Sequence, residues 1–88
     1  MQFEWDEKKA RSNKAKHGVD FEAVHAFDFD TALYVVDEAS DYGEERILAT
    51  GLIGTRVYTM VFTERDSRIR VISFRRATKT EIREFHER

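Results

Sequence analysis

Apolar and polar residues alternate along two successive segments, 56–64 and 69–76, and this pattern predicts two β-strands joined by a hairpin. With the turn placed at residues 65–66, Thr63 faces Arg68 across the hairpin. One face of the sheet then carries mostly apolar side chains, and the other face carries arginines. A sheet of this kind predicts an anion-binding surface on its arginine-bearing face.

In the rest of the chain, segments in which apolar and polar residues alternate predict strands. Segments that are amphipathic, or that have capping residues at their ends, predict helices. Strands are predicted near the start of the chain (3–5), at 33–36 and at 46–53, and helices at 7–17, at 21–27 and from Thr78 onward. Because the later strands follow one another through short connections, we expect an α+β fold. Its sheet is an antiparallel meander with helices packed on one face, two of them N-terminal and one C-terminal.

Polar residues at the predicted helix ends support these boundaries. Asp6 is a suitable N-cap for the first helix, and Gly18 stands where that helix ends. Thr78 and Glu81 match the capping box, in which two side chains satisfy free amides at a helix start. The first helix has only two apolar residues, both alanines, so we expect its lysines to lie on the surface.

The composition is that of one small domain, 1–88, without cysteine. The lack of cysteine excludes disulfides, cysteine-rich zinc sites and thiol catalysis. No apolar run approaches the roughly 20 residues of a membrane span, and the first residues do not resemble a signal peptide. We therefore expect a cytoplasmic protein with no membrane partner.

Charge is unevenly distributed, although the formal net charge is only −2. Residues 1–18 carry +2, residues 19–51 carry −8 and residues 52–88 carry +4. This distribution predicts a dipolar molecule that offers basic surfaces to an anion and an acidic surface to a basic partner. Acidic loops that are merely solvated explain the same pattern.

Several chemistries lack the residues they need. The three histidines lie in separate predicted elements, so no clustered ligand set for a metal is expected. Ser73 has no histidine predicted nearby to activate it, and the four glycines form no phosphate-binding loop. We therefore expect no metal and no cofactor.

The residues that remain are acids, bases and arginines, and RNA cleavage needs no more than these. The RNA supplies its own nucleophile, the 2′-hydroxyl. The protein has to align that group, stabilise the pentavalent phosphate and move protons. Arginine suits the second task because its planar guanidinium binds phosphate oxygens at two points.

Several motifs along the chain resemble those of the BrnT family, the toxins of type II bacterial toxin–antitoxin pairs. The most specific are Phe3-x-Trp5-Asp6-x-x-Lys9, Lys16-His17-Gly18-Val19 and Arg70-Val71-Ile72-Ser73-x-Arg75-x-Ala77-Thr78-x-x-Glu81. The family pattern usually has alanine where this chain has Phe74, and this phenylalanine is expected to narrow the site or to offer a stacking surface.

The resemblance implies a RelE-like α+β fold and a metal-independent endoribonuclease that inhibits translation. It also implies an antitoxin partner, BrnA, a small ribbon-helix-helix DNA-binding protein. In that family the toxin–antitoxin complex represses its own operon, so operator DNA is contacted only through the antitoxin. A dimer and a heterotetramer with the antitoxin are both open.

Site residues are assigned as hypotheses on the expectation that the arginines converge on one phosphodiester. The catalytic candidates are Arg70, Arg75, Arg76, Glu64 and His17, and the substrate-binding candidates are Ser73, Lys16, Arg68 and Lys79. The arginines would hold phosphate, and His17 or Glu64 would carry the proton. An imidazole exchanges protons near neutral pH, whereas a carboxylate in that role needs surroundings that favour its protonated form.

A second reading, from another class, is a non-catalytic binding module that partners a small DNA-binding protein. Clustering of the arginines with a proton carrier would separate the two readings, because a binding module needs no such carrier. For an antitoxin, the acidic segment 37–45 and the basic first helix are both candidate docking surfaces.

Overall fold

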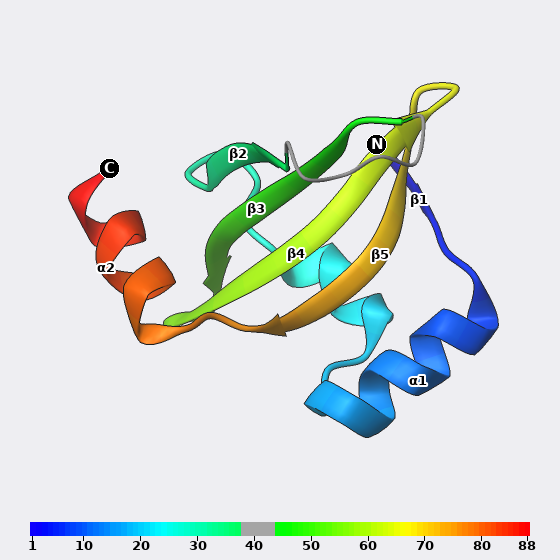
Figure 1. Ribbon diagram of the computed structural model, residues 1–88, viewed down its shortest axis with the longest axis horizontal. Coiled ribbons are helices and arrows are strands. Elements are labelled where there is room, and N and C mark those ends of the chain that lie inside the picture. The colour runs from blue at the N-terminus through cyan, green and yellow to red at the C-terminus, as the bar shows by residue number, and fades with distance from the viewer. Residues whose placement is uncertain (38–43) are drawn as a thin grey trace.

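The computed structural model describes residues 1–37 and 44–88, which form a five-stranded sheet with helices packed around it (Figure 1). The elements in chain order are β1 (Gln2–Glu4), α1 (Glu7–His17), the 3₁₀ helix η1 (Phe21–Ala26), β2 (Leu33–Asp37), β3 (Arg46–Ile53), β4 (Arg56–Arg65), β5 (Arg68–Arg76) and α2 (Lys79–Glu87). The predicted α+β class is confirmed. Most of the acidic segment, residues 38–43, lies outside the described residues. Within the described ranges no helix is long and apolar enough to cross a bilayer.

The strand order across the sheet is β1-β5-β4-β3-β2. Strands β2 to β5 are successive antiparallel neighbours, as expected for a meander, whereas β1 pairs with β5 in parallel. The sheet is therefore mixed and not purely antiparallel. Phe3 lies beside Ile69 in the parallel pair, and both side chains pack against the core. This apolar contact is gained only when β1 joins the sheet.

The second predicted helix, 21–27, is a short 3₁₀ helix, so the chain has one N-terminal α-helix and not two. The carboxylate of Asp20 caps η1 by accepting a hydrogen bond from the backbone N–H of Glu22 at 3.0 Å. Phe21 and Val24 are both buried. Because a 3₁₀ helix repeats every three residues, these two side chains point to the same side, toward the sheet.

The predicted register of the β4–β5 hairpin is wrong. The turn consists of Asp66 and Ser67, with φ angles of 50° and 67°, and Thr63 pairs with Arg70 instead of Arg68. A two-residue turn with both φ angles positive matches the twist of the flanking strands. The hairpin therefore closes one residue later than the sequence pattern predicted.

A bulge then interrupts the pairing near Val61 and Phe62. It leaves Ile72 as an extra residue in β5, since Phe62 pairs with Val71 and Val61 pairs with Ser73. Ser73 consequently lies on the sheet face of Arg70 and Arg75, and Phe74 lies on the opposite face.

The core lies on that opposite face, between the sheet and η1. It combines Phe21 and Val24 of η1 with Met60, Val71 and Phe74 of the sheet, all fully or almost fully buried. Phe74 therefore packs in the interior, and the expectation that it narrows or stacks in a functional site is wrong. A phenylalanine fits at this position because aromatic rings of Phe27 and Tyr58 meet its edge.

Helix α2 covers the other face of the sheet, so the helices are not all on one face as predicted. Its residue Glu81 contacts Arg75 and the Thr59 hydroxyl, and both of these residues point away from the core. The predicted capping box of Thr78 and Glu81 is confirmed. Figure 1 shows α2 (red) far from α1 and η1 (blue and cyan), which lie on the opposite side of the sheet.

Candidate functional site

The basic helix α1 is closed at both ends by the residues the sequence predicted. The Asp6 carboxylate accepts hydrogen bonds from the backbone N–H groups of Lys8 and Lys9, at 2.8 and 3.2 Å. These bonds hold the pKa of Asp6 below its usual range. Gly18 ends the helix with φ of 72°, and its N–H donates to the Lys14 carbonyl. Residues other than glycine rarely adopt this conformation, so the stop is well defined.

One side of α1 is turned toward β5 because Asn13 is anchored there. This side chain is buried, and its amide nitrogen donates to the carbonyl oxygens of Phe74 (2.8 Å) and Val19 (3.0 Å). Its amide oxygen accepts from the N–H of Phe74 at 3.1 Å. The amide thus pairs with β5 as a neighbouring strand would, at a point on the strand beyond the end of β1.

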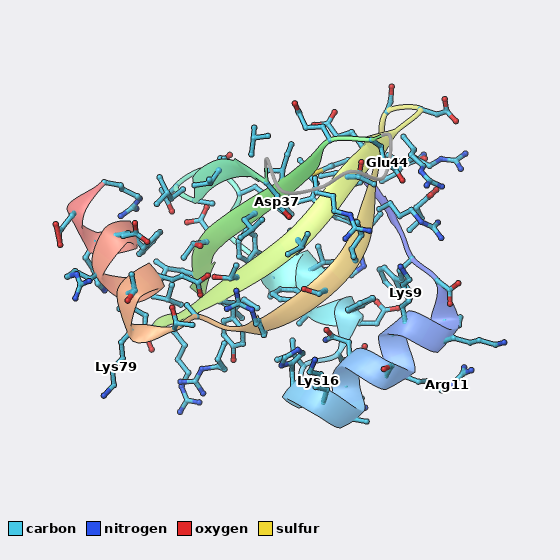
Figure 2. The ribbon with its side chains drawn as sticks, viewed as in Figure 1. Lys9, Arg11, Lys16, Asp37, Glu44 and Lys79 are labelled. Carbon is cyan, nitrogen blue, oxygen red and sulfur yellow. The ribbon has the colours of Figure 1, made fainter. Side chains whose placement is uncertain are left out.

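Lys9 and Lys16 stand on the same side of the helix as Asn13. Spacings of four and three residues place side chains one above another along an α-helix. Figure 2 shows Lys9 and Lys16 on the side of α1 toward the sheet, whereas Arg11 extends from the outer side. The helix therefore presents two ammonium groups along the edge of β5.

A hollow of about 240 Å³ lies between α1 and β5, and we call it the α1–β5 groove. Its lining comes from Lys9, Ser12, Asn13, Lys16 and His17 of the helix and from Ile72 and Ser73 of the strand. Within residues 1–37 and 44–88, neither Lys9 nor Lys16 forms an ion pair. The groove therefore offers two ammonium groups, two hydroxyls and one imidazole to a ligand.

Arg70 lies on β5 near the beginning of this groove and is paired with a carboxylate. Its guanidinium is 3.1 Å from Glu4 of β1, and Arg68 is 3.4 Å from the other oxygen of the same carboxylate. The hydrogen bond from Arg70 is the main reason that the pKa of Glu4 lies below its usual range. Glu4 thus stays ionised at neutral pH and neutralises part of the charge of both arginines.

Arg75 lies beyond the groove on the same strand and is held more firmly. Two parallel hydrogen bonds, of 2.7 and 2.9 Å, join it to the carboxylate of Glu81. The side chains are 27% and 19% exposed, so water screens the pair only partly. The guanidinium lowers the pKa of Glu81 to about 2, and this carboxylate is therefore a weak base at neutral pH.

The predicted convergence of the arginines is not found. Arg70 and Arg75 pair with Thr63 and Thr59 of β4, and four residues of strand separate these positions by roughly 13 Å. Arg76 points to the opposite face, where its guanidinium lies 5.7 Å from the centre of the Tyr58 ring.

Other candidates lie outside the groove. Glu64 is exposed on the face of Phe62 and Ile69, at the rim of a different cavity. Lys79 is exposed at the start of α2 and points away from the sheet in Figure 2. The predicted residues that the structure does bring together are Lys16, His17 and Ser73, all in the groove.

Lys9, Ser12 and Asn13 also line the groove, and the sequence analysis assigned them no role. Two of them carried a signal. Lys9 and Asn13 are spaced with Lys16 so that all three lie on one side of a helix. Asn13 also stands in a helix with few apolar residues, and its amide can both donate hydrogen bonds to a strand edge and accept them from it. The sequence analysis placed the lysines of this helix on the surface, where they are, and did not identify Asn13 as the residue that turns them toward β5.

No cluster of three or more histidine, cysteine, aspartate or glutamate side chains within the described ranges is arranged to hold a metal ion.

The model of one protein family, described as "Ribonuclease toxin, BrnT, of type II toxin-antitoxin system", matches residues 5–81. The chain belongs to the BrnT family. No curated protein matches the sequence.

As a BrnT chain, the protein is a ribonuclease toxin of a type II toxin–antitoxin system. RNA is therefore its target and an antitoxin its partner. The family match spans β5, α1 and the groove between them, together with Glu81, which pairs with Arg75. The groove has two lysines and an imidazole around one hollow.

Proposed function

We propose that the chain is an endoribonuclease whose reaction takes place in the α1–β5 groove without a metal ion. Lys9 and Lys16 bind the scissile phosphate, the Ser73 hydroxyl donates a hydrogen bond to it, and His17 accepts the proton of the RNA 2′-hydroxyl. The observation that carries this proposal is the presence of two ammonium groups, a hydroxyl and an imidazole around one hollow of about 240 Å³.

The reaction balances with the RNA as its own nucleophile. The 2′-oxygen forms a bond to phosphorus while the bond from phosphorus to the 5′-oxygen breaks. The proton of the 2′-hydroxyl passes to His17, and water supplies the proton that the departing 5′-oxygen takes up. The products are a 2′,3′-cyclic phosphate and a free 5′-hydroxyl. The ammonium groups of the lysines stabilise the additional negative charge of the pentavalent state.

Arg70 and Arg75 are assigned to neighbouring phosphates of the same RNA strand. They flank Ser73 on one sheet face, and each would exchange its carboxylate for a phosphate. Arg68 assists Arg70 through the carboxylate that they share. Arg76, Glu64 and Lys79 lie outside the groove, and the proposal gives them no part in the chemical step.

A cleavage assay tests the proposal with the purified chain, a labelled single-stranded RNA and a chelator. We expect His17→Asn to lower the cleavage rate by about 100-fold and Lys16→Ala by about 10-fold. A substrate with 2′-deoxyribose at the scissile nucleotide should not be cut. Arg11→Ala is the matched control, because it removes a cation from the outer side of the same helix.

The outcomes separate the two classes of function. Cleavage by His17→Asn at the parent rate would refute the assignment of the proton carrier. If the parent chain binds its antitoxin but cuts no RNA, the reading as a non-catalytic binding module replaces the nuclease. Thermal melting of each variant shows whether a loss of cleavage reflects loss of the fold.

The finer features implied by the family likeness are also proposals. They are a RelE-like fold, which the antiparallel run from β2 to β5 supports, and action on translation in the cytoplasm. The antitoxin is proposed to be a ribbon-helix-helix protein of the BrnA type. It would join the toxin in a dimer or heterotetramer that represses the operon.

A further inference from the structure

Strand β2 forms an open edge of the sheet. It is last in the strand order, and within residues 1–37 and 44–88 no strand pairs with its outer side. Three consecutive residues, Tyr34, Val35 and Val36, are 46%, 54% and 48% exposed. An edge strand with exposed apolar side chains pairs readily with another strand, and proteins usually protect such edges with charge, bulges or proline.

A mostly apolar cavity of about 380 Å³ adjoins this edge on the core face of the sheet. Val36 and Ile47, which are paired across β2 and β3, line it together with Phe62 and Ile69. Glu64 supplies a carboxylate at its rim. The cavity can thus take up one large apolar side chain and pair a neighbouring cation with Glu64.

Acidic residues flank β2, and two cations lie beside them: Arg46 is opposite Asp37 in the β2–β3 pair, and Arg88 donates a hydrogen bond to the Thr31 carbonyl. Asp28 and Asp30 precede the strand, and Asp37 is its last residue. Tyr34 donates a hydrogen bond to the Phe29 carbonyl at 2.6 Å. Burial raises the pKa of this phenol, and the charges of Asp30 and Asp28 raise it further.

We propose that the β2 edge and its cavity are the docking site for an extended segment of the antitoxin. The segment pairs as a sixth strand, inserts an apolar side chain beside Val36 and carries lysine or arginine toward Glu64. The inference depends on membership of a toxin–antitoxin family and is independent of the chemistry proposed for the α1–β5 groove.

A second copy of this chain is a poorer occupant for reasons of charge. Antiparallel pairing of two β2 strands would bring Asp37 of each copy toward the acidic residues that precede β2 in the other. Like charges opposed across a strand pair are destabilising. A basic segment gains from the same acidic residues, so charge complementarity favours a different protein.

The β2 edge and the α1–β5 groove are at opposite edges of the sheet (Figure 1), and the cavity beside β2 reaches as far as Ile69 of β5 on the core face. Strands β3 and β4 lie between β2 and β5. Substitutions on β2 should therefore weaken antitoxin binding without changing cleavage of RNA, and substitutions in the groove should do the reverse. This separation allows the two proposals to fail independently.

The test measures the affinity of the full chain for the antitoxin of the same operon, by calorimetry or interferometry. We expect Val36→Lys to weaken binding at least about 30-fold, because it adds a cation and removes an apolar contact, and Val36→Thr about 5-fold. Thr55→Lys is the matched control, because it adds the same charge at the exposed turn between β3 and β4. All three variants should cut RNA at the parent rate.

Two outcomes would overturn the docking proposal. One is unchanged antitoxin affinity in both Val36 variants. The other is a chain that is dimeric by light scattering in the absence of antitoxin and becomes monomeric as Val36→Lys, since a second copy would then occupy the edge. If the parent chain cuts no RNA while Val36→Lys still loses the antitoxin, the nuclease proposal fails and the docking site stands.

Discussion

The amide of Asn13 forms two hydrogen bonds with the main chain of Phe74, at 2.8 and 3.1 Å, and so joins α1 to β5 across 61 residues of sequence. A helix that contributes few apolar side chains is thereby held against the sheet by one polar residue. The same contact sets the spacing between the lysines of α1 and Ser73. The stability of the fold and the shape of the groove therefore depend on a single amide.

We expect Asn13→Ala to lower the free energy of unfolding by about 2–3 kcal/mol, because it leaves the N–H and carbonyl of Phe74 and the carbonyl of Val19 without their partner. Urea denaturation measures the loss. Ser12→Ala, an exposed neighbour on the same helix, should change stability by less than about 0.5 kcal/mol. Equal effects of the two substitutions would show that the amide is not an anchor.

The ion pair of Glu81 and Arg75 predicts a loss of stability in acid. The folded pKa of Glu81, about 2, lies below its ordinary value of 4.5. The pair's contribution is therefore fully present above about pH 4.5 and is lost as pH falls toward 2, and we expect it to be about 2–3 kcal/mol.

Denaturation curves of the parent and of Glu81→Gln between pH 2 and 7 test this prediction. Glutamine also serves in a capping box, so the helix start is largely preserved. The difference in stability between the two proteins should shrink as pH falls through this window. Glu84→Gln, an exposed change on the same helix, is the control and should follow the parent. A constant difference across the range would contradict the assignment.

Glu4 forms one ion-paired cluster with Arg70 and Arg68, so on the proposed binding mode it competes with RNA for these arginines. Glu4→Gln should increase affinity for single-stranded RNA. The plot of log affinity against log salt should become steeper by about 0.7 for each phosphate contact that is gained. Filter binding at several salt concentrations measures both quantities. An unchanged slope would show that these arginines do not reach the RNA.

Gly51 lies where β3 passes closest to the segment that follows η1. A Cβ atom there would be 2.8 Å from the ring of Phe27 and 3.2 Å from the carbonyl oxygen of Asp28. The ring is buried against Phe29 and Phe74 and has no room to withdraw. We expect Gly51→Ala to cost about 1–3 kcal/mol, measured by thermal melting. Thr55→Ala, at an exposed turn, should melt like the parent.

Local signals allowed much of the fold to be predicted. Asp6 and Gly18 bound α1 as expected, the residues 46–53 form β3, and the capping box starts α2. Each of these features depends on residues only a few positions apart. The family motifs identified the chain for the same reason, because they need only the order of residues and not their geometry.

The remaining features depend on contacts between distant residues or on backbone conformation. The parallel pairing of β1 with β5 and the ion pair of Glu4 with Arg70 span more than sixty residues. The hairpin register depends on two positive φ angles at Asp66 and Ser67, which alternation alone does not reveal. Arg70 and Arg75 share one sheet face because of the bulge, which alternation does not reveal either. Their separation follows from the five-residue spacing between them along an extended strand and was open to prediction.

The groove also has a consequence for synthesis of the chain on the ribosome. One wall is α1, near the start, and the other is the stretch of β5 around Ser73, near the end. The nascent chain has no complete groove until about four fifths of the residues have emerged. Closing so long a loop is entropically costly and comes late in folding. On the proposed assignment of the groove, the emerging chain therefore cannot cleave RNA for most of its translation.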